Sequence, residues 1–314
     1  MTDRVRVGIV GVGSLGQHHA RVYASLPEAE LVGVHDIDAG RASAAVARFG
    51  GRAFSSLEEM LPAVDAVSVA VPTADHHAVS RSLLLAGKDV LVEKPMTITL
   101  DEADDLIRTA EQSGRVFQVG HIERFNPAIA VLGETAVRPR FIEVHRLGSF
   151  SPRSLDIDVV LDLMIHDLDI VLALDGSEVV QVDAVGVPVL TTRVDIANAR
   201  LRFASGLIVN LTASRVSLEK VRKFRVFAPR TYVSIDLAAR EARVHRLLED
   251  PSGQPDIRIE HLVAPEREPL RLQLESFLEA VRRRSRPVVS GSDGRRALAL
   301  AHVVLARMKD AQPG

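Results

Sequence analysis

The sequence predicts an α/β protein with an N-terminal, doubly wound parallel sheet and a C-terminal α+β domain with an open, mostly antiparallel sheet. Apolar runs and helical segments alternate over residues 5–119, which favours parallel strands with crossover helices. A glycine-rich turn joins the first run to the first helical segment. Beyond residue 140, short strands joined by tight turns prevail. We expect the two domains at residues 1–121 and 122–314.

The elements of the first domain are predicted from apolar runs and from residues that are typical of helix ends. A Ser or Thr followed three residues later by Glu, as at Ser56 and Thr99, is typical of helix N-termini. Gly87 and Gly114 stand where helices should stop. The runs expected as strands buried on both faces are Val5–Val10, Leu31–Val34, Ala66–Val71, Val90–Val92 and Val116–Val119.

The second domain is expected to begin with a strand at Phe141–His145 and one long helix at Val159–Leu174. Helices at Leu270–Arg283 and Arg295–Met308 should end the chain, and Glu249–Asp256 is the loosest loop. Alternating or apolar segments predict further strands at Val179–Val187, Asp195–Phe203, Leu207–Ser214, Phe224–Pro229, Thr231–Leu237 and Ala242–Leu247.

Composition excludes several classes of protein. Lys plus Arg is 39 and Asp plus Glu is 41, so bulk charge gives no support for a nucleic-acid partner. The absence of cysteine excludes disulfides, thiolate metal sites and cysteine nucleophiles. The most apolar stretch, Val159–Leu174, is too short and too charged to span a membrane. We expect a cytoplasmic enzyme or binding protein.

The N-terminal turn has the pattern GxGxxG, formed by Gly11, Gly13 and Gly16. It lies between a strand and a helix, the context of the Rossmann dinucleotide fingerprint, in which Gly13 lets the backbone approach a pyrophosphate. Ser14 and Leu15 complete the turn and are expected to contact the cofactor at the helix N-terminus. The alternative is a glycine turn that holds no ligand.

Asp36 ends the second strand, 20 residues after Gly16, where an acid is expected to bind the adenosine ribose hydroxyls. A carboxylate there repels a 2′-phosphate, so NAD is favoured over NADP, although Arg41 nearby weakens that bias. The alternative is that Asp36 only caps the following helix.

Two further strand ends carry polar residues, Pro72-Thr73 and Glu93-Lys94-Pro95. Ligands bind open α/β sheets at the carboxyl ends of strands, so both should face the cofactor. The Lys94 ammonium would then stabilise a developing alkoxide. The alternative is a surface lysine in a turn.

The predicted helix Val159–Leu174 carries a polar stripe among apolar residues. Asp158, Asp162, His166 and Asp169 are spaced by four, four and three residues, which places them on one helical face. His166 is the member that can accept a proton near neutral pH, with Asp162 to orient it. Alternatives are a buried Asp–His pair and a metal site; without another ligand at suitable spacing, we expect no metal.

These motifs together resemble the Gfo/Idh/MocA oxidoreductases over essentially the whole chain. The resemblance implies an NAD-binding Rossmann domain and a substrate domain that also forms homodimers or homotetramers. His76 falls at a family histidine position, and Lys94, Asp162 and His166 match substrate-site positions. The cofactor-binding residues thus predicted are Gly11, Gly13, Ser14, Leu15, Gly16, Asp36, Pro72, Thr73, His76, Glu93 and Lys94.

The segments Val119–Ile129 and His145–Ile170 resemble one subgroup, whose members oxidise the 3-hydroxyl of UDP-N-acetylglucosamine with NAD. A substrate diphosphate would require arginines, and the segments contain Arg124, Arg146 and Arg153. These join Lys94, Asp162 and His166 as expected substrate-binding residues. In one departure, the glycines that family members often have near the helix motif are missing here. The alternatives are a free polyol or aldose dehydrogenase and a non-catalytic dinucleotide sensor.

Overall fold

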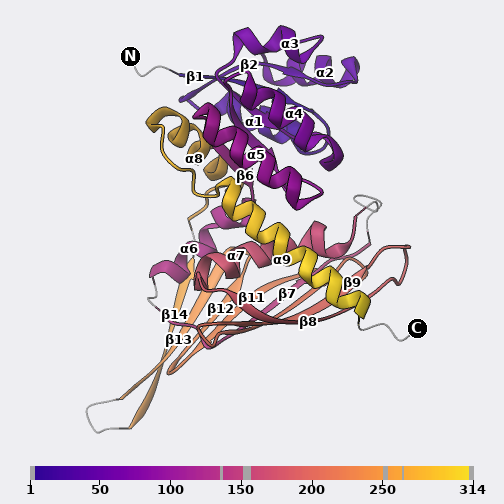
Figure 1. Ribbon diagram of the computed structural model, residues 1–314. Helices are drawn as coiled ribbons and strands as arrows, with labels where there is room; N and C mark the ends of the chain where they lie inside the picture. Colours follow the sequence, from indigo (N-terminus) through magenta and orange to yellow (C-terminus); the bar gives the residue numbers. More distant parts are fainter. Residues whose placement is uncertain (1–3, 135–136, 151–156, 250–253, 264, 311–314) are drawn as a thin grey trace. The chain divides into compact units, whose positions relative to one another are not determined.

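The computed structural model describes residues 4–134, 137–150, 157–249, 254–263 and 265–310 (Figure 1). The chain divides into two compact units: Met1–Ile122 with Glu268–Arg295, and Glu123–Arg267 with Arg296–Gly314. The functional boundary between residues 121 and 122 stays a prediction. The sequence did not indicate that a late segment, residues 268–295, would pack with the first unit.

The first unit is built on a six-stranded parallel sheet with strand order β3-β2-β1-β4-β5-β6. This order is that of a Rossmann fold, and it confirms the predicted doubly wound sheet. The strands are β1 Val5–Val10, β2 Ala29–His35, β3 Arg52–Ala53, β4 Ala66–Val69, β5 Asp89–Glu93 and β6 Phe117–Gly120. The helices are α1 Gly16–Ser25, α2 Ala39–Phe49, α3 Leu57–Met60 with the 3₁₀ turn η1 Leu61–Ala63, α4 Thr73–Leu85, α5 Leu100–Ser113 and α8 Pro269–Arg283.

The helix ends in this unit agree with the capping residues predicted from the sequence. Thr99 and Glu102 form the predicted reciprocal capping box at the start of α5. The Ser56 hydroxyl accepts from the Glu59 amide, whereas the Glu59 carboxylate turns to Ser55 instead. Gly114 ends α5 in the left-handed region at φ 62°.

Helix α8 completes the core of the first unit, although it comes from the far end of the chain. Leu274 and Phe277 are fully buried in the same cluster as Val7 and Ile9 of β1. Burial of a large apolar side chain contributes about 1.5–3 kcal/mol, so this helix is an integral part of the unit.

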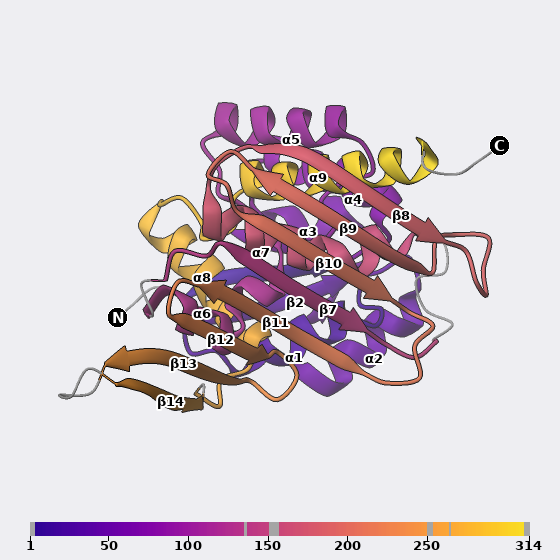
Figure 2. The ribbon, with the colours of Figure 1, turned by 90° about the horizontal axis from the view of Figure 1, so that it is seen from below.

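The second unit is built on an eight-stranded sheet with strand order β14-β13-β12-β11-β7-β10-β9-β8 (Figure 2). Only β7 and β10 pair in parallel, so the predicted mostly antiparallel sheet is confirmed. Its strands are β7 Phe141–Leu147, β8 Val179–Val187, β9 Ile196–Phe203, β10 Ile208–Ser214, β11 Val221–Ala228, β12 Thr231–Asp236, β13 Glu241–Glu249 and β14 Pro255–Val263. The other elements are the 3₁₀ turn η2 Ile122–Phe125, α6 Pro127–Glu134, the π-helix η3 Val160–Met164, α7 Ile165–Asp175 and α9 Gly291–Asp310.

One face of this sheet is covered and the other is not. Alternate strand residues join η3, α6, α7 and α9 in one apolar cluster, which the strands hide from view in Figure 2. The opposite face carries an aromatic row in which Phe141, Phe227, Tyr232 and His245 follow one another with ring centroids 4.9–5.5 Å apart.

Several elements differ from the prediction: β3 and α6 were not predicted, α9 begins at Gly291 instead of Arg295, and two further differences concern the region of η3 and strand β14. The expected continuous α-helix from Val159 begins instead as the π-helix η3, and only α7 is α-helical. The strand β14 was not predicted, because its residues are exposed on both faces and show no buried alternation. Among the described residues, no helix is long and apolar enough to cross a membrane.

Candidate dinucleotide and substrate sites

The turn after β1 is shaped by three glycines with different roles. Gly11 has φ 84°, and a Cβ there would lie 2.7 Å from the Ala70 carbonyl oxygen. A Cβ on Gly16 would overlap the Gly11 carbonyl oxygen, so this position packs the helix onto the strand. At Gly13, no atom of the described residues lies within 4 Å of the position that a Cβ would take. This space is open to a ligand that approaches the main chain.

The N-terminus of α1 is suited to an anion. No side chain caps α1, whereas Asp38, Ser56 and Thr99 cap α2, α3 and α5. The Gln17 and His18 amides donate to the Gly13 and Leu15 carbonyls, and the positive end of the α1 dipole favours a diphosphate at this helix end. Ser14 and Leu15, next to this helix end, are exposed. The residues present thus fit a bound dinucleotide.

Asp36 links the glycine turn to the end of β2. Its Oδ2 accepts from the Val12 amide at 2.8 Å, and its Oδ1 accepts from the Asp38 amide at 2.9 Å. The N-cap of α2 is Asp38, so Asp36 is not the helix cap that we considered as an alternative. A carboxylate has about four acceptor positions, so two remain for ribose hydroxyls.

His76 is buried and contacts two main-chain carbonyls, and its expected contact with the cofactor stays a prediction. It is 1% exposed; its Nδ1 lies 2.9 Å from the Pro95 carbonyl oxygen and its Nε2 lies 3.0 Å from that of Val71. Burial lowers the pKa of His76 below its ordinary value. His76 therefore connects the turn after β4 to the turn that carries Lys94.

Glu93 is also buried and has protein partners, and its expected cofactor contact stays a prediction. It is 8% exposed, and its Oε1 lies 3.1 Å from His19 Nε2 and 3.5 Å from Gln273 Nε2. Burial raises and His19 lowers the pKa of Glu93, which is held below its ordinary value overall. A Cβ on Gly120 would lie 2.6 Å from the same carboxylate oxygen.

The partners of Glu93 were missed from the sequence. His19 had a signal, because it follows Gly16 by three residues in the first turn of α1. Gln273 had no such signal, because it lies 180 residues from Glu93 in α8.

The other predicted residues at these strand ends are more accessible than Glu93. Lys94 and Thr73 are partly buried, and Pro72 is exposed. These three keep a ligand-facing role as a prediction.

In the second unit, η3 and α7 carry the polar residues of the predicted stripe. His166 lies in the first turn of α7 and is 9% exposed, and Asp162 lies in η3 and is partly buried. A π-helix is wider than an α-helix, so Asp162 and His166 are not related by the α-helical spacing that we assumed. Such π segments occur frequently at functional sites.

Arg146 holds α7 in place through two buried carboxylates, and its expected contact with the substrate stays a prediction. It is 3% exposed, donates to both Asp167 oxygens at 2.8 and 2.7 Å, and donates to Glu123 at 2.8 Å. The Arg146 guanidinium is thus engaged with two buried carboxylates. Arg124 donates to Asp169 at 3.2 Å, so it too contacts the helix motif.

Asp195 and Arg215 form a second buried pair, which the sequence did not reveal. Asp195 accepts from the amides of residues 189–191, from the Thr191 hydroxyl and from Arg215. Arg215 also donates to the Ile157 carbonyl, and Asp158 accepts from the Val194 amide. These bonds fix the chain where it enters η3.

Arg153 lies outside the described residues, so its predicted role in substrate binding has no geometry with which it can be compared.

Within the part of the chain that the structure describes, no cluster of three or more His, Asp or Glu side chains could hold a metal ion.

A parallel 3-2-1-4-5-6 sheet with an open GxGxxG turn and an acid at the end of β2 defines the class of dinucleotide-dependent dehydrogenases. Residues 5–121 match the family model described as "Oxidoreductase family, NAD-binding Rossmann fold". Residues 139–232 match that of the "GFO/IDH/MocA C-terminal domain". The chain belongs to the Gfo/Idh/MocA family of oxidoreductases and has an NAD-binding Rossmann domain.

Similarity to proteins of known activity extends over the whole chain. The chain is 42% identical over 299 residues to a UDP-N-acetylglucosamine 3-dehydrogenase from Acidithiobacillus ferrooxidans, and the alignment covers 95% of both chains. A solved structure of that protein aligns with a TM-score of 0.92 and 98% coverage of both chains. A scyllo-inositol 2-dehydrogenase (NAD⁺) from Bacillus subtilis is 29% identical, with coverage of 93% and 91%. These relatives are dehydrogenases.

Proposed function

We propose that the protein oxidises a secondary hydroxyl of a nucleotide sugar with NAD, and that the substrate is UDP-N-acetylglucosamine, converted to its 3-keto form. The 42% identity to a UDP-N-acetylglucosamine 3-dehydrogenase, spread over 95% of both chains, carries the choice of substrate. The open glycine turn and the uncapped N-terminus of α1 support the choice of a dinucleotide.

Oxidation of the alcohol removes a hydride from carbon and a proton from oxygen. NAD, held by the glycine turn and Asp36, would supply the hydride acceptor. In our proposal His166 accepts the hydroxyl proton, Asp162 orients the imidazole, and the Lys94 ammonium stabilises the negative charge that develops on oxygen. The products are the ketone, NADH and a proton, which His166 releases to solvent. Histidine suits this role because its ordinary pKa lies near neutrality.

The proposal assigns the remaining contacts as follows. Residues 1–121 bind NAD, through the main chain of the glycine turn, with Asp36 on the adenosine ribose and Pro72 and Thr73 beside the nicotinamide. Residues 122–314 bind the sugar and form a homodimer or homotetramer. The sheet face that carries the row of Phe141, Phe227 and Tyr232 supports self-association, because these partly buried aromatic side chains are of a type enriched at interfaces.

Arg153 is our first choice for the substrate diphosphate, with Arg124 second. A charge-assisted contact is worth roughly 1.5–3 kcal/mol. Arg153→Ala should therefore raise KM for the UDP-sugar by about one to two decades and leave KM for NAD unchanged. Arg202→Ala, which removes an exposed arginine from β9, is the matched control and should change neither constant.

The test is NAD reduction, followed by absorbance, with UDP-N-acetylglucosamine, free N-acetylglucosamine and scyllo-inositol at equal concentrations. We expect turnover of the UDP-sugar and at least about a hundredfold lower kcat/KM for the others, since two lost phosphate contacts cost about 3 kcal/mol. Efficient turnover of scyllo-inositol would instead support the second candidate, a polyol dehydrogenase, which the 29% identical inositol enzyme favours. Equal efficiency with free N-acetylglucosamine would show that no diphosphate contact exists.

A further inference from the structure

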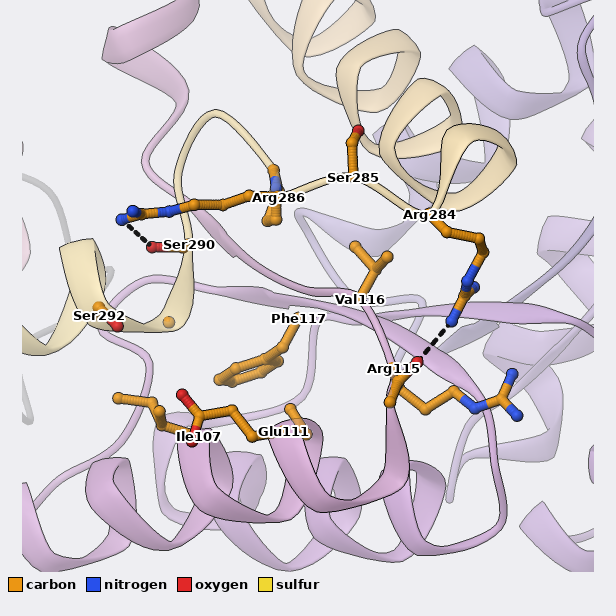
Figure 3. Close-up of a pocket in the computed structure, with 14 residues that line it drawn as sticks. Ile107, Glu111, Arg115, Val116, Phe117, Arg284, Ser285, Arg286, Ser290 and Ser292 are labelled. Atoms are coloured by element: carbon orange, nitrogen blue, oxygen red, sulfur yellow. Dashed lines mark hydrogen bonds between the residues drawn. The ribbon is translucent and has the colours of Figure 1, made fainter.

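The first unit has two hollows where its strands begin. The amino ends of the strands lie at the end of the sheet opposite to the glycine turn. One, of about 450 Å³, is lined by residues before or at the start of β1, β4 and β5 and by the end of α8; we call it the edge groove. The other, of about 420 Å³, lies between the end of α5, the start of β6 and the segment from Arg284 to Ser292 (Figure 3). Arg115 and Arg284 line both, so the hollows adjoin.

The edge groove is cationic. The cations that line it are Arg4, Lys88, Arg115, Arg282 and Arg284, and the carboxylates are Asp65 and Asp89. Both carboxylates are already paired, Asp65 with Arg6 at 2.6 Å and Asp89 with Arg284 at 2.7 Å. The carboxylates of the groove therefore form an ion pair with only one of its five lining cations, Arg284, although the Lys88 ammonium also helps to lower the pKa of Asp65.

The other four cations differ in how they are held. Arg4 donates to the Ala29 carbonyl and Lys88 to the Val64 carbonyl, each at 2.9 Å, and a carbonyl satisfies a donor without cancelling its charge. Arg115 and Arg282 are exposed, and no bond from their side chains is found within the described residues. Two fixed and two adjustable cations around one hollow suit a small anion with several charges.

The adjoining hollow offers a different surface. Figure 3 shows the Phe117 ring beside Ile107 on its floor, with Ser290 and Ser292 on one side and Arg284 on the other. Arg286 donates to the Ser290 hydroxyl at 3.0 Å, and Ser290 donates to Asp293 at 2.6 Å. Apolar and hydroxyl groups next to a cationic groove would accommodate an uncharged group attached to the anion.

We propose that the edge groove binds the di- or triphosphate group of a small molecule, whose organic part occupies the adjoining hollow. A small ligand is favoured over a nucleic acid because the whole chain has a net charge of −2, which gives no support for binding through bulk charge. Their volumes lie in the range of small-molecule sites, about 300–1,000 Å³. The site does not depend on the identity of the substrate.

The experiment is calorimetric titration of the full chain, saturated with NAD so that the dinucleotide site is filled. The probes are inorganic triphosphate, UTP, and sulfate at matched ionic strength. We expect triphosphate to bind the edge groove and sulfate to bind at least about tenfold more weakly, because it has fewer charges to share among four cations. We expect UTP to bind more tightly than triphosphate.

Two variants decide the location. Arg115→Ala combined with Arg282→Ala should weaken triphosphate binding by about thirtyfold or more, since each exposed charge-assisted contact contributes about 1 kcal/mol. Arg283→Ala is the matched control, because this neighbour pairs with Glu279 and lines neither hollow. It should change binding by less than about twofold.

An unchanged affinity in the double variant would overturn the proposal, because the anion would then bind elsewhere, for example at the proposed substrate arginines. An equal loss in Arg283→Ala would also overturn it, by showing that only general charge matters. Equal affinities for UTP and triphosphate would remove the adjoining hollow from the site.

Discussion

The glycine turn of the first unit and the α7 region of the second are both held rigidly, but by different means. In the turn, main-chain atoms approach so closely that a Cβ on Gly16 would overlap the Gly11 carbonyl. At α7, charged side chains make the contacts, with Arg146 on Asp167 and Glu123, and Arg124 on Asp169. The first region depends on the absence of side chains, and the second on the pairing of buried charges.

This difference separates the expected effects of substitution. A substitution that adds a side chain to the glycine turn should act by steric overlap or by loss of cofactor contact, without a change in the chemistry. A substitution that removes a side chain near α7 should act through an uncompensated charge or through a lost catalytic group. The predictions below probe this contrast.

The largest expected effects are those of His166→Ala and Lys94→Ala. Each should lower kcat by about 10²–10⁴, the usual effect of losing a general base or an electrostatic stabiliser. Binding of NAD, measured by calorimetry without substrate, should be retained. A near-normal kcat in either variant would remove that residue from the proposed mechanism.

Arg146→Met tests the buried charges. It leaves Asp167 and Glu123 without their shared guanidinium, and breaking a buried ion pair typically costs about 3–5 kcal/mol. Urea unfolding should show this loss. Arg225→Met is the control, because its pair with Glu143 is about one-third exposed and should contribute less than about 1 kcal/mol. Similar losses in both variants would contradict the special role of Arg146.

The glycines can be compared within one turn. Gly16→Ala should destabilise the protein by about 3 kcal/mol, because the new methyl group meets a backbone oxygen that cannot move freely. Gly13→Ala should change stability by less than about 0.5 kcal/mol, since its Cβ meets nothing within 4 Å. It should nevertheless weaken NAD binding by about tenfold, because the methyl group occupies the diphosphate position. Unaltered NAD affinity in Gly13→Ala would contradict the proposed binding mode.

A smaller effect is expected from acid. Burial raises and Arg146 lowers the pKa of Glu123, which lies below its ordinary value overall. A depressed folded pKa contributes stability at pH values above the unfolded pKa of about 4.3, and this stability is lost as the pH falls through the folded pKa. Glu123→Gln should remove this part of the acid-induced loss of unfolding free energy between pH 5 and 2. An identical pH profile would show that Glu123 does not contribute.

The smallest effect concerns cofactor choice. Asp36→Ser should narrow the preference for NAD over NADP by about tenfold, because the repulsion of the 2′-phosphate is lost. Asp38→Ser is the control: it alters the cap of α2, where serine substitutes well, and should leave the preference unchanged. If the unaltered protein uses NADP as efficiently as NAD, the role proposed for Asp36 is contradicted.

The same contrast explains what the sequence revealed. Gly11, Gly13 and Gly16 are neighbours whose requirements are local, so the turn and the parallel sheet were predictable. The strand order of the second sheet was not, because β7 pairs with β10 and β11, which lie more than 60 residues away.

Side-chain direction was the part of the site that the sequence could not predict. Glu93 ends β5 and His76 lies in the first turn of α4, but a strand end does not tell which side chain turns inward. Arg146 had an unused signal. It shares the parity of Ile142 and Val144 in β7, so strand alternation places it on the face covered by helices. Its partner Asp167 is 21 residues further along the chain, which no local pattern discloses.

The return of α8 to the first unit has a consequence for how the protein forms in the cell. A nascent chain that has exposed only residues 1–122 lacks the helix whose Leu274, Phe277 and Leu278 belong to the core of that unit. Although N-terminal domains generally fold first during synthesis, this one cannot complete its core until α8 has emerged, which requires residues 123–268 to be synthesised first. Until then its unfinished apolar surface is available to chaperones, and a fragment ending at residue 122 should aggregate when expressed alone.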